Sequence, residues 1–118
     1  MNANTRQLHD LGQRLWLDNI TRDLLDSGTL ARYIADLSVT GLTSNPTIFE
    51  HAIGSGASYD EAVQALAMRG LSEEGVFFEI ALQDLTRAAD LFRPVFDGSD
   101  GVDGWVSLEV SPLLAGDT

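Results

Sequence analysis

Hydrophobic residues along this chain follow two kinds of spacing, and each predicts a different type of element. Two stretches repeat apolar residues at i, i+3, i+4 and i+7, the period of an amphipathic helix. The residues on these two faces are Leu30, Tyr33, Ile34 and Leu37 in the first stretch, and Phe77, Ala81, Leu85, Ala88 and Phe92 in the second. We expect Ser27 or Thr29 to cap the first helix, and Pro94 to end the second because proline has no backbone N–H to donate.

Shorter helices are predicted between and before these two. One covers residues 4–12, and another covers 46–53 and begins with Pro46, a residue that suits a first helical turn. A third follows Ser58 and Glu61, because their spacing is that of a capping box.

Three short runs predict β-strands instead: 14–19 (RLWLDN), 39–45 (VTGLTSN) and 104–111 (GWVSLEVS). The third run has a period of two, and the members of its apolar side are Val106, Leu108 and Val110. If that side packs on helices, Ser107 and Glu109 face the other side of the sheet. Strands that alternate with helices form parallel βαβ units, so the sequence predicts a single α/β domain.

Each predicted strand ends on a side chain that can take part in chemistry: Asp18, Asn45 and Glu109. Parallel α/β proteins place their sites at the carboxyl ends of strands. An acid or amide at such a junction is also a common helix N-cap, and that interpretation stays open for Asp18 and for Asn45, which follows Thr43 and Ser44. Glu109 is harder to explain as a cap, because a carboxylate within a strand is costly unless it faces a site.

Composition narrows the classes of function. The 118 residues carry a net charge of -11, from 18 acidic and 7 basic residues, which argues against nucleic acid or an anionic membrane as a partner. Without cysteine there is no disulfide and no thiolate metal site. The N-terminus has no apolar leader segment, so we expect a cytoplasmic protein. The acidic loop 97–104 lacks the glycine and glutamate spacing of a calcium loop.

Three stretches resemble the opening of the transaldolase family: LWLDNITRDLLDSGTLARYI, GLTSNPTIFEHAI and WVSLEVSPLLAGDT. The similarity extends from about Leu8 to Thr118, and S-N-P-T after the second strand is typical of the longer bacterial form. Each stretch contains an expected functional residue, and their order is that of the family. The resemblance implies that residues 1–118 are the N-terminal part of a (β/α)8 TIM barrel, contributing its first three βα units, in an enzyme without metal or cofactor.

Transaldolases of the pentose phosphate pathway transfer a dihydroxyacetone unit from a ketose phosphate to an aldose phosphate through a lysine Schiff base. By position, Asp18 matches the acid that exchanges a proton with the sugar hydroxyl as the carbon–carbon bond breaks. Asn45 matches the amide that hydrogen-bonds the dihydroxyacetone unit, and Thr43 belongs to the same substrate-binding segment. Glu109 matches the acid that acts through a water on imine formation and hydrolysis. Such a reaction needs a base for the hydroxyl proton and a proton relay at the carbinolamine.

The sequence departs from the family in one respect: all seven basic residues are arginine, and there is no lysine. Arginine cannot form the Schiff base because it stays protonated. In the family that lysine lies on the fourth strand, and a complete barrel takes ~250 residues. We therefore expect the front portion of an enzyme, inactive alone, whose partner is the remainder of its own barrel. Asp117 or Thr118 resembles the N-cap of a further helix.

Two other interpretations stay open. The chain could be a short non-catalytic α/β protein that binds a sugar or a partner subunit, which the absence of lysine favours. It could also be an acidic interaction domain that uses the helix predicted over 72–92. In the leading interpretation the partners are sugar phosphates such as fructose 6-phosphate and sedoheptulose 7-phosphate, and the sequence leaves homo-oligomerisation open.

Overall fold

The computed structural model describes residues 2–55, 57–109 and 112–117. Its centre is a parallel sheet of three strands in the order β1-β2-β3: β1 (Leu15–Leu17), β2 (Val39–Thr43) and β3 (Trp105–Ser107). The helices are α1 (Ala3–Asp10), α2 (Arg22–Asp26), α3 (Thr29–Leu37), α4 (Pro46–Ser55), α5 (Asp60–Met68) and α6 (Glu73–Gly98), with 3-10 turns η1 (Ala57–Tyr59) and η2 (Pro112–Leu114). The predicted arrangement of three parallel strands alternating with helices is confirmed.

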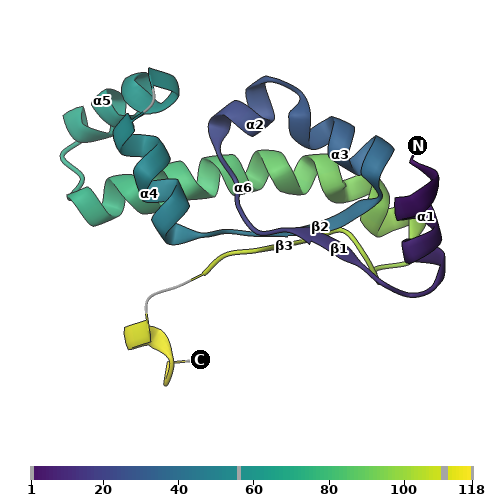
Figure 1. Cartoon of the computed structure of the whole chain (residues 1–118). Helices are drawn as coiled ribbons and strands as arrows, with labels where there is room; N and C mark the ends of the chain where they lie inside the picture. The colour runs from purple at the N-terminus through teal and green to yellow at the C-terminus, as the bar shows by residue number, and fades with distance from the viewer. Residues whose placement is uncertain (1, 56, 110–111, 118) are drawn as a thin grey trace.

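The helices α2 to α6 lie on one face of the sheet, and α1 lies beside the ends at which the strands begin (Figure 1). Leu17, Leu42 and Val106 occupy the same level of the three strands. Paired residues of parallel strands point to the same face, and these three pack against the helices. On the opposite face the Trp16 indole lies over Gly41, where a side chain would have no room.

Two clusters of buried side chains hold the helices to the sheet and to one another. The cluster above the sheet consists of Ile20, Leu25, Leu30, Val39, Leu42, Leu85, Ala88 and Phe92. The cluster between α4, α5 and α6 consists of Phe49, Tyr59, Leu66, Ile80 and Ala81. In the second cluster Phe49 meets Tyr59 and Phe77 edge to face, with ring centroids 5.6 and 5.3 Å apart. The apolar faces predicted for the two long helices are confirmed, with α6 contributing to both clusters.

The expected end of α6 at Pro94 is wrong, because the helix continues through the proline to Gly98. Proline removes one backbone hydrogen bond, but Phe92 before it is buried and Val95 after it packs against the core above the sheet. Pro94 itself is exposed. Arg93 and Asp97 form an ion pair across the same turn at 3.0 Å. Packing on both sides of the proline therefore outweighs the lost bond.

Two predicted helix caps are also wrong. The N-cap of α3 is Gly28 with φ 75°, a left-handed conformation that glycine adopts without strain, and no side chain caps the helix. Ser58 does not cap α5, because its hydroxyl donates to Asp23 across the helix layer and the N-cap is Tyr59. At α5 a contact formed by folding replaced the local capping bond, whereas at α3 the Ser27 hydroxyl bonds locally to the hydroxyl of Thr29 at 2.7 Å.

The third strand is shorter than its alternating pattern predicts. It pairs with β2 only as far as Ser107, and Leu108 and Glu109 follow as extended chain outside the ladder. Val110 lies outside the described residues. Val106 packs on the helices as expected.

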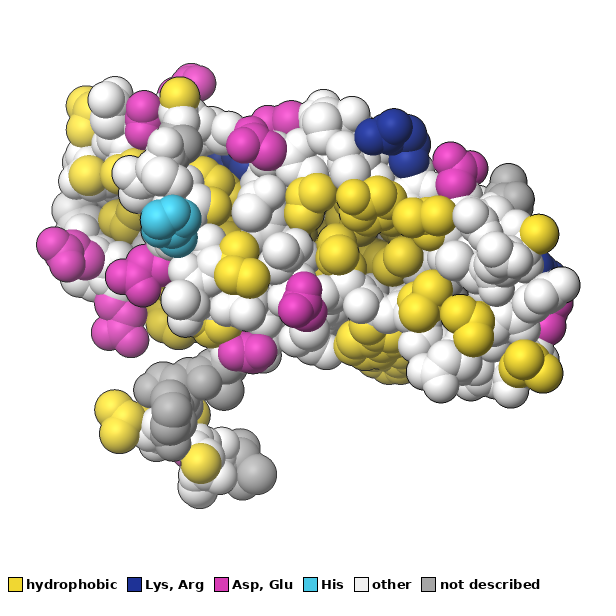
Figure 2. Space-filling model, in the orientation of Figure 1, with side chains coloured by type: hydrophobic (Ala, Val, Ile, Leu, Met, Phe, Trp, Pro, Cys, Tyr) yellow, Lys and Arg dark blue, Asp and Glu magenta, His cyan; other side chains and the backbone are white. Residues whose placement is uncertain are grey.

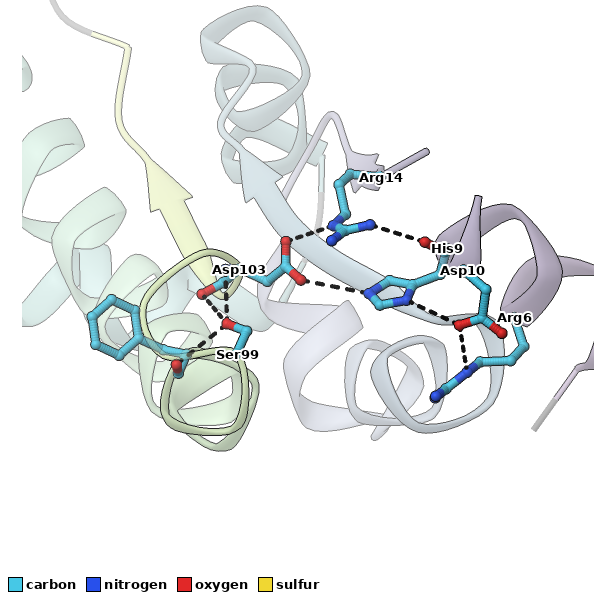
Figure 3. A network of polar contacts seen from close by, with 7 residues as sticks. Arg6, His9, Asp10, Arg14, Ser99 and Asp103 are labelled. Carbon is cyan, nitrogen blue, oxygen red and sulfur yellow. Dashed lines mark hydrogen bonds and ion pairs between the residues drawn. The ribbon is translucent and has the colours of Figure 1, made fainter. Parts of the chain in front are cut away.

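A network of ion pairs joins α1 to the start of the sheet (Figure 3). Asp103, in the loop before β3, is buried and accepts from Arg14 Nε at 2.8 Å, while His9 Nε2 of α1 lies 3.5 Å from its other oxygen. Ser99 Oγ accepts from the Asp103 N–H at 2.8 Å. The side chain and backbone of Asp103 therefore link α1, the start of β1 and the loop before β3.

Charge is spread unevenly over the surface. Acidic side chains surround the end formed by α4 and α5, and hydrophobic side chains gather across the middle of the same face (Figure 2).

No helix among the described residues is long and apolar enough to cross a bilayer.

Candidate functional site

Three of the four predicted site residues follow neighbouring strands at the same edge of the sheet. Asp18 comes directly after β1, whereas Asn45 and Glu109 each lie two residues beyond the ends of β2 and β3. The strands are parallel and in register, with Leu17, Leu42 and Val106 side by side. The carboxyl ends of the strands therefore bring a carboxylate, an amide and a second carboxylate to one edge.

Asn45 serves as the N-cap of α4 in this structure. Its Oδ1 accepts from the N–H of Ile48 at 3.2 Å, and its carbonyl accepts from the N–H of Phe49 at 2.9 Å. The side-chain NH₂ has no hydrogen-bond partner within the described ranges, and Asn45 is half-buried. The capping interpretation is thus confirmed for the oxygen, while the two N–H donors stay available to a ligand.

Thr43 and Ser44 connect β2 to this cap. Thr43 is the last residue of the strand, is half-buried and pairs in register with Ser107. Ser44 is buried, its N–H donates to the Ser107 carbonyl at 3.0 Å, and its Oγ accepts from the N–H of Glu109 at 2.9 Å. Ser44 therefore links the segment that carries Asn45 to the segment that carries Glu109.

Asp18 and Glu109 are both exposed, which differs from the strand-embedded carboxylate predicted for position 109. The physical reason is that β3 ends two residues earlier, so Glu109 stands at the rim of the sheet. No arginine of the described chain forms an ion pair with either carboxylate. Both groups are hydrated and open to a ligand approaching the strand ends.

A buried polar cluster supports the segment that follows Asp18. Asp84 of α6 is fully buried and accepts from Arg22 Nε at 2.9 Å and from the Tyr59 hydroxyl at 2.7 Å. Burial, followed by the hydrogen bond to Asp84, raises the pKa of Tyr59 well above its usual value. The same Tyr59 oxygen accepts from the N–H of Arg22, the first residue of α2. The cluster fixes where α2 begins, four residues after Asp18.

The sequence patterns did not identify Ser44 or Asp84 as residues of interest. For Ser44 the usable signal was the proline two positions later, since a proline ends strand pairing. For Asp84 the signal was an acid on the apolar side of a long helix, beside Ala81, Leu85 and Ala88. A buried acid in such a position requires a cationic or hydroxyl partner.

A hollow between helices lies away from these strand ends. It has a volume of about 560 Å³, and its walls are the apolar sides of α4, α5 and α6 with Glu50, Glu73 and Glu74 at its rim. None of the four predicted site residues lines it. We assign the candidate site to the strand ends, because two carboxylates and an amide follow neighbouring parallel strands there.

The fold and this edge define a parallel α/β protein with acid–base and amide groups at the carboxyl ends of its strands. A family model described as Transaldolase/Fructose-6-phosphate aldolase matches residues 15–118. The chain belongs to this family. The matched region begins with β1 and contains all four predicted site residues.

Curated relatives named transaldolase match the chain along almost its whole length. It is 50% identical to the "Transaldolase" of Thermobifida fusca over 118 residues, which is 100% of this chain and 32% of that protein. It is 47% identical to the "Transaldolase" of Saccharopolyspora erythraea, over 99% of this chain and 31% of that protein. The "Transaldolase 2" of Nostoc punctiforme is 39% identical over 95% of this chain and 29% of its own length. The chain thus spans about a third of the length of these relatives.

Proposed function

We propose that this chain is the N-terminal portion of a transaldolase and forms the first three βα units of its (β/α)8 barrel. The full-length protein would transfer a dihydroxyacetone unit from sedoheptulose 7-phosphate to glyceraldehyde 3-phosphate, giving erythrose 4-phosphate and fructose 6-phosphate. One observation supports this most strongly. In a chain that belongs to the family, Asp18, Asn45 and Glu109 end three adjacent parallel strands at one edge.

In this proposal each residue has a separate part in the reaction. Asp18 takes the proton from the ketose hydroxyl while the adjacent carbon–carbon bond breaks, and returns it to the acceptor aldehyde when the new bond forms. The free N–H donors of Asn45 hold the hydroxyls of the dihydroxyacetone unit, with Thr43 beside them. Glu109 transfers protons through a water while the imine forms and is hydrolysed.

The amine nucleophile has to come from outside these residues, because the sequence contains no lysine. Each βα unit of a barrel takes roughly 30 residues, so we expect the lysine at the end of a fourth strand, roughly 30–45 residues after Glu109. A weakly polar environment would depress its pKa toward neutrality and leave it nucleophilic. We further propose a cytoplasmic location for the full-length protein.

Borohydride trapping tests the function directly. The full-length protein incubated with fructose 6-phosphate and borohydride should gain one reduced dihydroxyacetone unit, and peptide mapping should place it on the lysine of the fourth strand. The 118-residue chain treated in the same way should keep its mass. A full-length product without an adduct or without a lysine in that window would overturn the proposal and favour the non-catalytic sugar-binding alternative.

A further inference from the structure

The pairing of β2 with β3 stops at a definable bond. Thr43 and Ser107 are register partners, and the N–H of Ser44 donates to the carbonyl of Ser107 at 3.0 Å. In a parallel ladder, the next two bonds would run from the N–H of Glu109 to the carbonyl of Ser44, and from the N–H of residue 46 to the carbonyl of Glu109. Residue 46 is proline, which has no N–H. The ladder therefore cannot extend past Glu109.

The hydroxyl of Ser44 replaces the carbonyl that would have continued the ladder. The N–H of Glu109 donates to Ser44 Oγ at 2.9 Å, a bond between residues 65 positions apart. Ser44 is only 6% exposed, so its short side chain has little freedom. Regular pairing ends at Ser107, yet the backbone of Glu109 stays attached to the end of β2.

Ser44 is itself held by its neighbour in the sequence. Asn45 caps α4 through its Oδ1 and also accepts from Phe49 through its carbonyl, at 3.2 and 2.9 Å. A displacement of Ser44 would therefore have to move the start of α4. Through its bond to Ser44, the backbone of Glu109 is fixed relative to the start of α4.

We propose that Ser44 is a positioning residue that holds the backbone of Glu109 beside Asn45, so that the Glu109 carboxylate and the Asn45 amide reach one substrate. The inference rests on the proposed function, because the position of Glu109 matters to catalysis only if its carboxylate assists imine chemistry. Replacement of Ser44 by alanine leaves the Glu109 N–H without its acceptor. The backbone that carries the Glu109 carboxylate then loses its attachment to the end of β2.

Amide hydrogen exchange in the full-length protein tests the bond without reference to activity. In Ser44→Ala the amide of Glu109 should exchange about 3- to 10-fold faster, the change expected for one hydrogen bond. Ser44→Thr keeps the hydroxyl and should keep the protection. Thr40→Val is a matched control, because it removes a buried hydroxyl in β2. The Oγ1 of Thr40 has no hydrogen-bond partner among the described residues. Unchanged exchange at Glu109 in Ser44→Ala would overturn the inference.

A double-mutant cycle tests the catalytic consequence. We expect Ser44→Ala to slow single-turnover trapping of the imine by about 10- to 100-fold with little change in KM, because a misplaced group loses rate rather than binding. Added to Glu109→Gln, it should cause almost no further loss, and Ser44→Thr should restore the rate. Independent, multiplying effects of the two substitutions would overturn the positioning role. A wild-type protein that forms no imine would overturn the proposed function and this role in it, while the exchange result would still decide the bond.

Discussion

Carboxylates at the two ends of the sheet differ in burial and in ion pairing. At the amino ends Asp103 is buried and is held by Arg14 at 2.8 Å, with His9 at 3.5 Å. At the carboxyl ends Asp18 and Glu109 are exposed, and no cation of the described residues pairs with them. Among the described residues, a carboxylate is paired with a cation at the amino ends of the strands, whereas the carboxylates at the carboxyl ends are exposed and have no cationic partner.

The difference shows how one small sheet separates stability from chemistry. A desolvated carboxylate is stable only with a partner, so the amino-end network fixes three segments in place. A hydrated carboxylate needs no internal partner and can exchange protons with a ligand. In barrels of this kind the carboxyl-end face carries the site and the opposite face carries stability.

The largest effect is expected from Asp18→Asn in the full-length protein. The substitution keeps the size of the side chain but removes the base, so kcat should fall by about 10²–10⁴, the usual contribution of a positioned acid–base group. The unfolding midpoint should hardly change, because Asp18 is exposed and makes no ion pair with the described residues. Steady-state kinetics measure kcat, and urea unfolding measures the unfolding midpoint. Near-normal turnover would show that Asp18 is not the base, and the capping interpretation would not explain the residue either, because the N-cap of α2 is Thr21.

The opposite result is expected from Asp103→Asn. Loss of the charge leaves Arg14 without its main partner, and because Arg14 is about a third exposed we expect a loss of about 2 to 3 kcal/mol in unfolding free energy rather than the full effect of a buried pair. The turnover number should stay within about twofold of wild type, since the residue lies at the far end of the sheet. Asp97→Asn provides the control, because its pair with Arg93 is exposed and should contribute less than about 0.5 kcal/mol. A large loss of turnover in Asp103→Asn would show that the two ends are coupled.

The fold was largely predictable from hydrophobic spacing, because the buried faces of α3 and α6 repeat at helical period. The sequence did not reveal where a contact formed on folding would replace or outweigh a local hydrogen bond. Pro94 sits inside α6 because packing of Phe92 and Val95 outweighs one lost hydrogen bond. Ser58 bonds to Asp23 instead of capping its own helix, and that partner is 35 positions away.

The positions of the candidate site residues were predictable from the same hydrophobic spacing, because this spacing also locates the strand ends. Strand ends fixed the positions of Asp18, Asn45 and Glu109, and the parallel register brings these ends to one edge. Spacing could not reveal that Ser44 bonds to Glu109 across 65 positions, since that contact exists only once two strands pair. Nor could it place Glu109 outside the ladder.

A second buried carboxylate, Asp84, is expected to make the stability of the fold depend on alkaline pH. Its partner Tyr59 has a pKa raised above the unfolded value of about 10, so the folded state binds this proton more tightly. The contribution to stability is fully present below about pH 10 and is lost as the pH rises above it. Wild type should therefore lose unfolding free energy above that pH more steeply than Tyr59→Phe, with equal slopes below it. Parallel curves throughout would mean that folding does not raise the pKa of Tyr59.

A small effect on stability is expected from Asn45→Asp, because the oxygen and the NH₂ group of this side chain have different roles. Asn45→Asp keeps an oxygen to cap α4 next to a favourable helix dipole, so unfolding free energy should stay within about 0.5 kcal/mol of wild type. It removes the NH₂ donors, so KM for the ketose phosphate should rise by about tenfold, the loss of one good hydrogen bond to a ligand. Asn45→Ala should lose the cap as well, at about 1 kcal/mol. If Asn45→Asp binds and turns over substrate normally, Asn45 is a helix cap alone and contributes no ligand to the site.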